Sequence, residues 1–265
     1  MKKSRLYIAE GLPCSGKSST ARYISEITGG VFFDENCGCH PADYEFSAFI
    51  PDNAPEFTPQ EREQFKKNAE PADGGMIIPL NTVLAPTFDK ALQYKIYDFL
   101  DWETERRLML DKWRSFAESA LSDEKIYVFN CVLLQNPMCE TMMRFGQTPE
   151  QSLEYISEIC RIIEPLSPVV VYLNNTHIAD SIKAALPERG EEWLNSVVDY
   201  HCGGAYGRQM GLSGFEGYVS ALEERQRREL SFLPKLPVKS IILTDPQQDW
   251  NAALNSVANA LKTEE

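Results

Sequence analysis

Eight consecutive residues near the start of the chain constrain its fold more than any other feature. The run Gly11-Leu12-Pro13-Cys14-Ser15-Gly16-Lys17-Ser18 fits the pattern G-x-x-x-x-G-K-[ST] at every fixed position. A short apolar run, Leu6–Ala9, precedes it, and a helical pattern from Ser18 to Thr28 follows it. A strand, a glycine-containing turn and a helix in this order hold phosphate groups on backbone N–H groups and a helix N-terminus. The segment predicts a site for a nucleoside triphosphate.

The pattern also predicts roles for individual residues. We expect Lys17 to reach the β- and γ-phosphates and the Ser18 hydroxyl to ligate Mg²⁺, so the expected cofactors are ATP and Mg²⁺. We also expect Lys17 to face solvent when the loop is free. The residues expected to bind the nucleotide are Gly11, Pro13, Cys14, Ser15, Gly16, Lys17, Ser18 and Ser19.

Short apolar runs alternate with helical patterns along the rest of the chain. After the first strand, the expected strands are Val31–Phe33, Ile126–Phe129, Val169–Leu173 and Ser240–Leu243. Alternation of this kind predicts parallel βαβ units with right-handed crossovers. The predicted fold is α/β: a three-layer α/β/α P-loop NTPase fold with a mostly parallel five-stranded sheet.

The pattern is consistent with one domain over residues 1–265, because single α/β domains often exceed ~200 residues. Prolines interrupt the stretch at about 36–85, which we interpret as an irregular excursion of loops and short helices. A helical region follows from about 88 to 121, with a buried stripe of Met109, Trp113, Phe116 and Ala120. A basic-acidic stretch at about 186–215 has the character of a lid.

Charge and composition exclude several classes of protein. The chain has 26 Lys+Arg and 39 Asp+Glu, a formal net charge of −13, so it repels nucleic-acid phosphates. Its apolar runs are far shorter than the ~20 residues that span a bilayer. A secretory apolar region and cleavage site are missing, and the seven cysteines are expected to be reduced thiols. We expect a cytoplasmic protein that binds neither nucleic acid nor membrane.

Two acidic residues follow the second strand directly. Asp34 and Glu35 come after Val31–Phe33, at the edge of the sheet where α/β proteins bind ligands. A GTPase would need D-x-x-G and N-K-x-D patterns in strand context, and these are missing. A motor ATPase would need a later strand that ends in an acid, whereas the later strands are followed by Asn130 and Asn174. This pattern favours a kinase.

The arrangement resembles the thymidylate kinase and deoxynucleoside kinase group of P-loop kinases. The resemblance rests on the phosphate loop and the acids after the second strand. It also covers the long helix before strand three, the fourth strand Val170–Leu173, the stretch Pro187–Glu192 and a final strand and helix, Ile241–Leu261. It implies that Asp34 and Glu35 face the phosphoryl acceptor. One departure is Asn130-Cys131, where the group usually has an acid followed by arginine, and it leaves open whether Asn130 replaces that acid.

The expected activity is transfer of the γ-phosphoryl group of ATP to a small-molecule acceptor, for which a nucleoside or nucleotide is one candidate. The residues expected to carry it are Lys17, Asp34, Glu35 and Arg189, with Arg189 as the lid arginine. Between the two acids, Asp34 is favoured as acceptor base because it ends the strand. The competing hypothesis is a P-loop nucleotide-binding regulator or ATPase that acts through a protein partner. The acceptor and the oligomeric state stay open, with a homodimer as one arrangement.

Two further patterns have ordinary interpretations. Cys37-x-Cys39-His40 suggests zinc, with His201-Cys202 as distant partners, but zinc sites more often use C-x₂₋₄-C spacing, so loop thiols are the favoured interpretation. The mixed charges around Arg225, Arg227 and Arg228 are typical of a solvated, salt-bridged helix face.

Overall fold

The computed structural model describes residues 3–35 and 37–262. The chain divides into two compact units: a main unit, Met1–Glu35 with Trp113–Glu265, and an inserted unit, Asn36–Lys112. The expected excursion begins at Asn36, which lies outside the described residues, as do 1–2 and 263–265. None of the described helices is long and apolar enough to cross a membrane.

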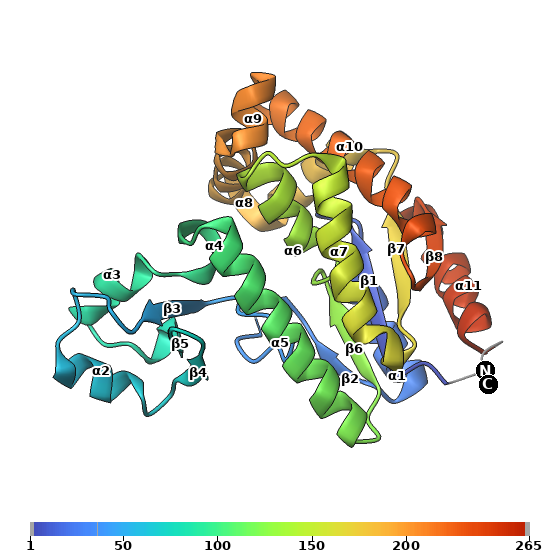
Figure 1. Cartoon of the computed structure of the whole chain (residues 1–265). Helices are drawn as coiled ribbons and strands as arrows, with labels where there is room; N and C mark the ends of the chain where they lie inside the picture. The colour runs from blue at the N-terminus through green and yellow to red at the C-terminus, as the bar shows by residue number, and fades with distance from the viewer. Residues whose placement is uncertain (1–2, 36, 263–265) are drawn as a thin grey trace. The chain divides into compact units, whose positions relative to one another are not determined.

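The main unit contains a five-stranded parallel sheet with the order β2-β6-β1-β7-β8. Figure 1 shows β6, β1, β7 and β8 side by side in that order. The strands are β1 (Leu6–Gly11), β2 (Val31–Phe33), β6 (Tyr127–Asn130), β7 (Val169–Asn174) and β8 (Lys239–Thr244). The strand order changes direction at β1, which places the end of β1 at a position where parallel sheets bind ligands.

Helices cover both faces of this sheet. On one face, Ala9, Val128 and Val171 pack against α1 (Lys17–Thr28) and α11 (Trp250–Lys262). On the opposite face, Phe129 contacts the rings of Trp113 and Phe116 from α5 (Trp102–Ser122). Because helices cover both faces, every residue of β1 is buried, and so is every residue of β7 except Asn174, which is half-buried. The three-layer α/β/α fold predicted from the sequence is confirmed.

Further helices of the main unit connect and flank the strands of the sheet. They are α6 (Gln135–Met138), the π-helix η2 (Cys139–Arg144), α7 (Pro149–Ile163), η3 (Glu164–Leu166), α8 (Ile178–Gly203), α9 (Ala205–Met210), α10 (Gly214–Phe232), η4 (Leu233–Lys235) and η5 (Pro246–Gln248). Thr148 caps α7 with a capping box: its side chain accepts the Gln151 N–H, and the Gln151 side chain accepts the Thr148 N–H. Gly29 ends α1 in the left-handed conformation expected of a C-terminal glycine.

The inserted unit is more regular than the sequence suggested. It contains a three-stranded antiparallel sheet, β3-β5-β4, where an irregular excursion was expected. Its elements are β3 (Ser47–Pro51), α2 (Pro59–Phe65), β4 (Glu70–Ala72), β5 (Gly75–Pro79), η1 (Leu80–Thr82), α3 (Thr87–Leu92) and the short α4 (Ile96–Phe99). The prolines misled the prediction because Pro51 and Pro79 end their strands and Pro71 lies on an edge strand, all positions that need no ladder N–H.

A small apolar core stabilises this unit. Ile50, Ile78 and Leu80 are buried together with Phe57 and Phe65, whose rings meet edge to face. The unit is thus organised around its own packed residues, and its strands are too short to give a clear period-two pattern.

Candidate active site

The phosphate loop joins β1 to α1 and has the backbone that its glycines make possible. Gly11 has φ +144, and a Cβ there would lie 2.6 Å from the Leu173 carbonyl oxygen. Gly16 has φ +96, and a Cβ there would lie 2.2 Å from the Trp250 ring. Helix α1 begins directly after Gly16 without a side-chain cap. The N–H groups of its first turn therefore have no partner within the helix and are available to an anion.

Lys17 differs from the expectation that it faces solvent. Its side chain is buried, and Nζ donates a 2.7 Å hydrogen bond to the Leu12 carbonyl oxygen inside the loop. The ammonium has few other acceptors at the centre of a loop whose N–H groups are donors, so it binds the nearest carbonyl. Ser15 is also buried, and among the described residues its Oγ has no hydrogen-bond partner. A polar atom buried without a partner indicates a position that a ligand completes.

Ser18 lies in a polar cluster formed by three segments of the main unit. Ser18 Oγ donates to Asp34 Oδ1 at 3.3 Å, and Asn130 Nδ2 donates to both Ser18 Oγ and Asp34 Oδ1, at 2.9 and 2.7 Å. Arg22, one turn along α1, pairs with Asp34 Oδ2 at 2.8 Å. The ends of β2 and β6 and the start of α1 thus bring the Asp34 carboxylate to the Ser18 hydroxyl.

This donor set fits a magnesium ion. Mg²⁺ prefers hard oxygen ligands and usually completes its shell with water and substrate phosphates, so it needs only one or two protein oxygens. Ser18 Oγ and the Asp34 carboxylate supply those oxygens side by side. Asn130 donates an amide N–H to Asp34 and so holds its carboxylate in place. An acid at position 130 would instead add a second negative charge beside Asp34.

Glu35 points to different partners from Asp34. Its Oε1 accepts a 3.1 Å hydrogen bond from Gln135 Nε2, at the start of α6. The Cys131 thiol lies close enough to Glu35 for the two to interact. Burial raises the pKa of this thiol well above its usual range, the Lys17 charge lowers it, and the Glu35 charge raises it further. The two neighbouring acids therefore separate: Asp34 lies with Ser18, and Glu35 lies with the turn after β6.

Arg189 lies close enough to the phosphate loop to affect it. Burial raises the pKa of the Cys14 thiol, and the positive charge of Arg189 is the largest influence that lowers it. Arg189 is exposed and stacks on Trp193 at 4.8 Å. Helix α8 breaks next to it, at Gly190, where φ is 82 and ψ is 166. The break separates Arg189 from the regular helix that carries Trp193.

The helix face around Arg225 is not solvated as expected. Arg225 and Glu229 are fully buried and pair at 3.0 Å, and Arg228 is buried against Glu224. Arg227 alone of the three arginines is exposed. Opposite charges three or four residues apart occur both on a solvated, salt-bridged helix face and in a buried ion pair. The sequence pattern alone therefore does not distinguish the two.

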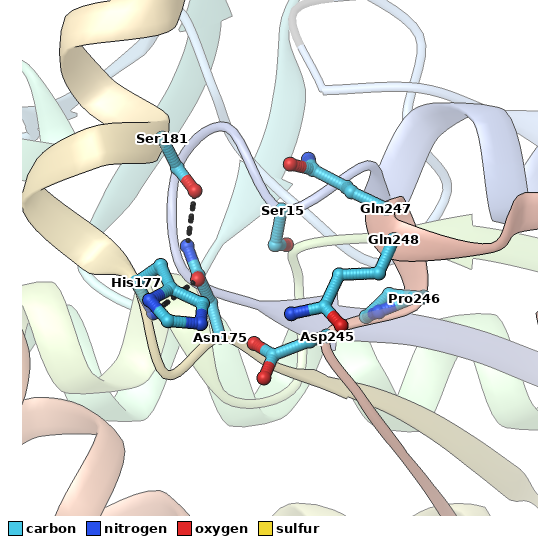
Figure 2. A pocket seen from close by; sticks show the side chains of 8 residues that line it. All are labelled: Ser15, Asn175, His177, Ser181, Asp245, Pro246, Gln247 and Gln248. Carbon is cyan, nitrogen blue, oxygen red and sulfur yellow. Dashed lines mark hydrogen bonds between the residues drawn. The ribbon is translucent and has the colours of Figure 1, made fainter.

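A cavity of about 190 Å³ lies beside the phosphate loop, at the carboxyl ends of β7 and β8. Figure 2 shows Asn175 and His177 on one side, Gln247 and Gln248 on the other, and Ser15 between them. Asn175 Nδ2 donates to Ser181 Oγ at 2.9 Å, and the His177 N–H donates to Asn175 Oδ1 at 2.9 Å. Gln247 also donates to the Cys14 carbonyl oxygen of the loop. The cavity presents amide, hydroxyl and imidazole groups, which suit a heterocycle.

The sequence analysis did not identify several of these residues. Arg22, Gln135 and the lining of the cavity gave no signal, because each acts through a contact between segments far apart in the chain. Cys37 and Cys39 have their sulfur atoms 3.9 Å apart. Within residues 3–35 and 37–262, no group of three or more His, Cys, Asp or Glu residues is placed to hold a metal.

The chain matches no protein-family model and no curated protein sequence. Among solved structures it is similar to "Structure of deoxyadenosine kinase from M.mycoides with bound dATP", with 17% identity, a TM-score of 0.45, and coverage of 97% of this chain and 99% of that chain. A second similar structure is the deoxyadenosine kinase from M. mycoides with bound dCTP, with 14% identity, a TM-score of 0.44 and the same coverage. Both neighbours are deoxynucleoside kinases, the group that the sequence resembles.

Proposed function

We propose that this chain is an ATP-dependent kinase that transfers the γ-phosphoryl group to the hydroxyl of a small acceptor, with nucleosides as the first class to test. The observation that carries the proposal is the separation of Asp34 from Glu35. One carboxylate lies with the Ser18 hydroxyl, and the other lies free of that cluster at the same edge of the sheet. A protein that only bound nucleotide would have no use for the second.

The phosphate loop binds the donor in this proposal. The uncapped N-terminus of α1 and the loop N–H groups of residues 14–19 surround the phosphates. Lys17 exchanges the Leu12 carbonyl for phosphate oxygens, because an anion attracts an ammonium more strongly than a neutral carbonyl does. Arg189 adds a positive charge from the side of Cys14. Gly11, Pro13, Cys14, Ser15, Gly16, Lys17, Ser18 and Ser19 together form the donor site.

Ser18 and Asp34 would hold a magnesium ion, which would neutralise charge on the phosphates. Arg22 and Asn130 fix the Asp34 carboxylate, so its oxygens are oriented before any ligand binds. Glu35 is the acceptor base: it accepts the proton of the attacking hydroxyl and orients its oxygen toward the phosphorus. This assignment replaces Asp34 with Glu35 as the favoured base.

The cavity beside Ser15 receives the base of the donor nucleotide. Its lining has donors and acceptors at both ends, from Asn175 to Gln248, and it opens directly onto the loop. Ligands of parallel α/β sheets bind outside the carboxyl ends of the strands, and β7 and β8 end at this cavity.

The test is a screen of acceptors with the purified chain, Mg²⁺ and ATP. Nucleosides, nucleoside monophosphates and simple alcohols are supplied singly, ADP is measured, and the phosphorylated product is identified by ³¹P NMR. We expect one acceptor class to raise ADP production at least ~10-fold over hydrolysis alone, and the Glu35→Gln variant to abolish the rise. ATP binding without acceleration by any small acceptor would overturn the proposal in favour of a regulator.

A further inference from the structure

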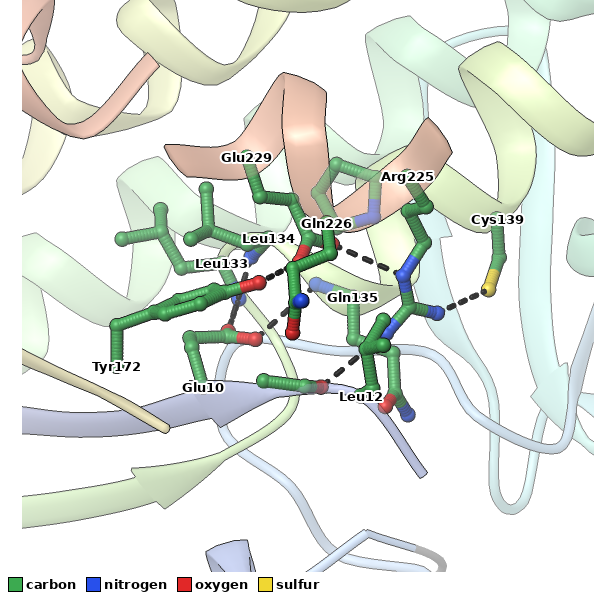
Figure 3. A network of polar contacts seen from close by, with 12 residues as sticks. Glu10, Leu12, Leu133, Leu134, Gln135, Cys139, Tyr172, Arg225, Gln226 and Glu229 are labelled. Carbon is green, nitrogen blue, oxygen red and sulfur yellow. Dashed lines mark hydrogen bonds and ion pairs between the residues drawn. The ribbon is translucent and has the colours of Figure 1, made fainter. Parts of the chain in front are cut away.

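A buried acid lies directly before the phosphate loop. Glu10 is the penultimate residue of β1, is fully buried, and lies beside Tyr172 of β7 in the strand register. A carboxylate inside a sheet is costly unless it is hydrogen-bonded, so its partners indicate what it does. Figure 3 shows the network around it.

Both oxygens of Glu10 bind one turn of backbone. Oε1 accepts the N–H groups of Leu133 and Leu134 at 2.7 and 2.9 Å, and Oε2 accepts that of Gln135 at 3.1 Å. This turn connects β6 to α6, and it begins at Cys131, which has the left-handed φ of 68. Three N–H groups that would otherwise be buried without partners are thus held by a single side chain.

The turn that Glu10 holds carries a side chain of the proposed acceptor site. The backbone N–H of Gln135 donates to Glu10 Oε2, and its side-chain Nε2 donates to Glu35 Oε1 at 3.1 Å. A continuous chain of hydrogen bonds therefore leads from the strand that ends in the phosphate loop to the acid proposed as acceptor base.

A second buried charge holds the next residue of the same strand. Arg225 donates to the Gly11 carbonyl oxygen at 3.1 Å and pairs with Glu229, which accepts a 2.6 Å hydrogen bond from the Tyr172 hydroxyl. Arg225 and Glu10 thus fix adjacent residues at the junction of strand and loop. Arg225 reaches it from α10, and Glu10 reaches outward to the β6–α6 turn.

We propose that Glu10 is a positioning residue that ties the phosphate loop to the acceptor base: its carboxylate fixes the 133–135 turn, and Gln135 in turn orients Glu35. This inference rests on the proposed kinase function for its catalytic consequence, whereas its structural content is independent of any ligand. Glu10 itself contacts neither donor nor acceptor in this proposal.

The proposal has a consequence for pH. Burial, followed by the nearby charge of Glu229, raises the pKa of Glu10 to about 7, against the lowering by its three backbone bonds. The titratable and charged groups around it are Glu229 and Arg225 from α10, Tyr172 from β7 and Cys131 from the turn. Protonation places a hydrogen on one oxygen and removes an acceptor from the turn. The turn should therefore loosen as pH falls through about 7.

Hydrogen exchange of the ligand-free protein tests the positioning role directly. In the wild type, protection factors of the Leu133, Leu134 and Gln135 amides, corrected for intrinsic rates, should fall between pH 8 and pH 6. In Glu10→Gln the amide nitrogen cannot accept, so at pH 8 the protection of at least one of these amides should fall ~10- to 100-fold. Tyr172→Phe is the matched control, because it removes a buried hydrogen bond from the neighbouring strand without touching the turn.

Two results would overturn the inference. One is equal protection of residues 133–135 in wild type and Glu10→Gln, and the other is protection of these residues in the wild type that does not change with pH. If Glu10→Gln does not fold, the wild-type pH series alone decides. On an identified acceptor, Glu10→Gln should lower kcat at least ~10-fold, leave the Kd of ATP within about threefold, and lose the inflection near pH 7 that the wild type shows. An absence of kinase activity in the wild type would overturn the proposed function and leave the exchange result standing.

Discussion

Asp34 and Glu35 are neighbours in sequence with different surroundings. Both residues follow the end of β2 at Phe33, and Asp34 reaches α1 while Glu35 reaches α6. The first carboxylate is surrounded by Ser18, Asn130 and Arg22, and its charge is already balanced. The second accepts a hydrogen bond from the Gln135 amide and interacts with the Cys131 thiol. Replacement of each by its amide separates the two roles.

Glu35→Gln should lower turnover on the identified acceptor by ~10²–10⁴-fold, because the amide cannot accept the hydroxyl proton. The Kd of ATP should stay unchanged, since Glu35 lies outside the donor cluster. Asp34→Asn, the matched variant, should instead raise the Mg²⁺ concentration for half-maximal activity. Titration calorimetry and a magnesium titration of the rate measure the two effects. If Glu35→Gln retains full turnover, the assignment of the base is wrong.

Lys17→Met should weaken ATP binding by ~10- to 100-fold, the loss expected when a charge-assisted hydrogen bond to phosphate is removed. Methionine keeps the buried stem, so the fold should survive the loss of the Leu12 contact. Lys235→Met, at an exposed position of η4, is the charge-matched control and should bind ATP as the wild type does. Equal affinities of Lys17→Met and wild type in calorimetry would argue against a phosphate site.

At the scale of elements, helix α8 is two helices joined at Gly190. The conformation there, φ 82 and ψ 166, belongs to a region that only glycine occupies without strain. Apart from its chain neighbours and nearby helix backbone, no described atom lies within 4 Å of a Cβ built on Gly190, so the cost of a side chain there is that of the backbone conformation. The break orients Arg189 independently of the helix that continues through Trp193.

Gly190→Ala should therefore displace Arg189 from the phosphate loop and lower turnover by at least ~10-fold, short of the ~10²–10³-fold typical when a charge-stabilising donor is lost. Gly203→Ala is the matched control in the same element. Gly203 has ordinary backbone and open space around it, so its replacement should leave turnover unchanged. Steady-state rates of both variants and of Arg189→Ala give the comparison, and full activity of Gly190→Ala would show that the break is dispensable.

The predictability of each element followed from whether its signal is local. The strands of the main sheet, the loop at Gly11–Ser18 and the capping box at Thr148 depend on residues adjacent in sequence, and the structure confirms their elements. The inserted sheet was missed because two of its short strands end in proline and the third contains one. Lys17 was expected to be exposed because the sequence motif gives no sign that its ammonium bonds to the Leu12 carbonyl inside the loop. The Glu10, Gln135 and cavity contacts are all tertiary, and a single sequence does not encode them in any period or motif.

At the scale of the whole molecule, each unit buries a histidine in its neutral form. Burial lowers the pKa of His40 in the inserted unit to about 3 and that of His201 in the main unit to about 4. Both values lie below the ordinary 6.5, so between about pH 6.5 and 4 the unfolded chain binds protons that the native chain does not. Stability from these groups is therefore present above pH 6.5 and is lost as pH falls toward 4.

His201→Gln should flatten this acid limb, because the replacement has no proton to bind. The melting temperature of the wild type should fall between pH 7 and pH 5, and that of His201→Gln should fall less over the same interval. Glu10 acts in the opposite direction, since an acid with a raised pKa loses its contribution as pH rises from about 4.5 to 7. Calorimetric melts at half-unit intervals measure both slopes. An unchanged acid limb in His201→Gln would mean that the imidazole is not buried neutral.

The fit of Trp250 against Gly16 has a consequence for how the protein is made. The ring occupies the space that any side chain at Gly16 would need, and Gln247 holds the Cys14 carbonyl from a position 233 residues later in the sequence. During synthesis the phosphate loop therefore leaves the ribosome long before the residues that shape it. A nascent chain that stops short of residue 245 has the complete binding motif but not its walls. For the ATP site proposed above, ATP should therefore stabilise only chains whose synthesis has passed that point.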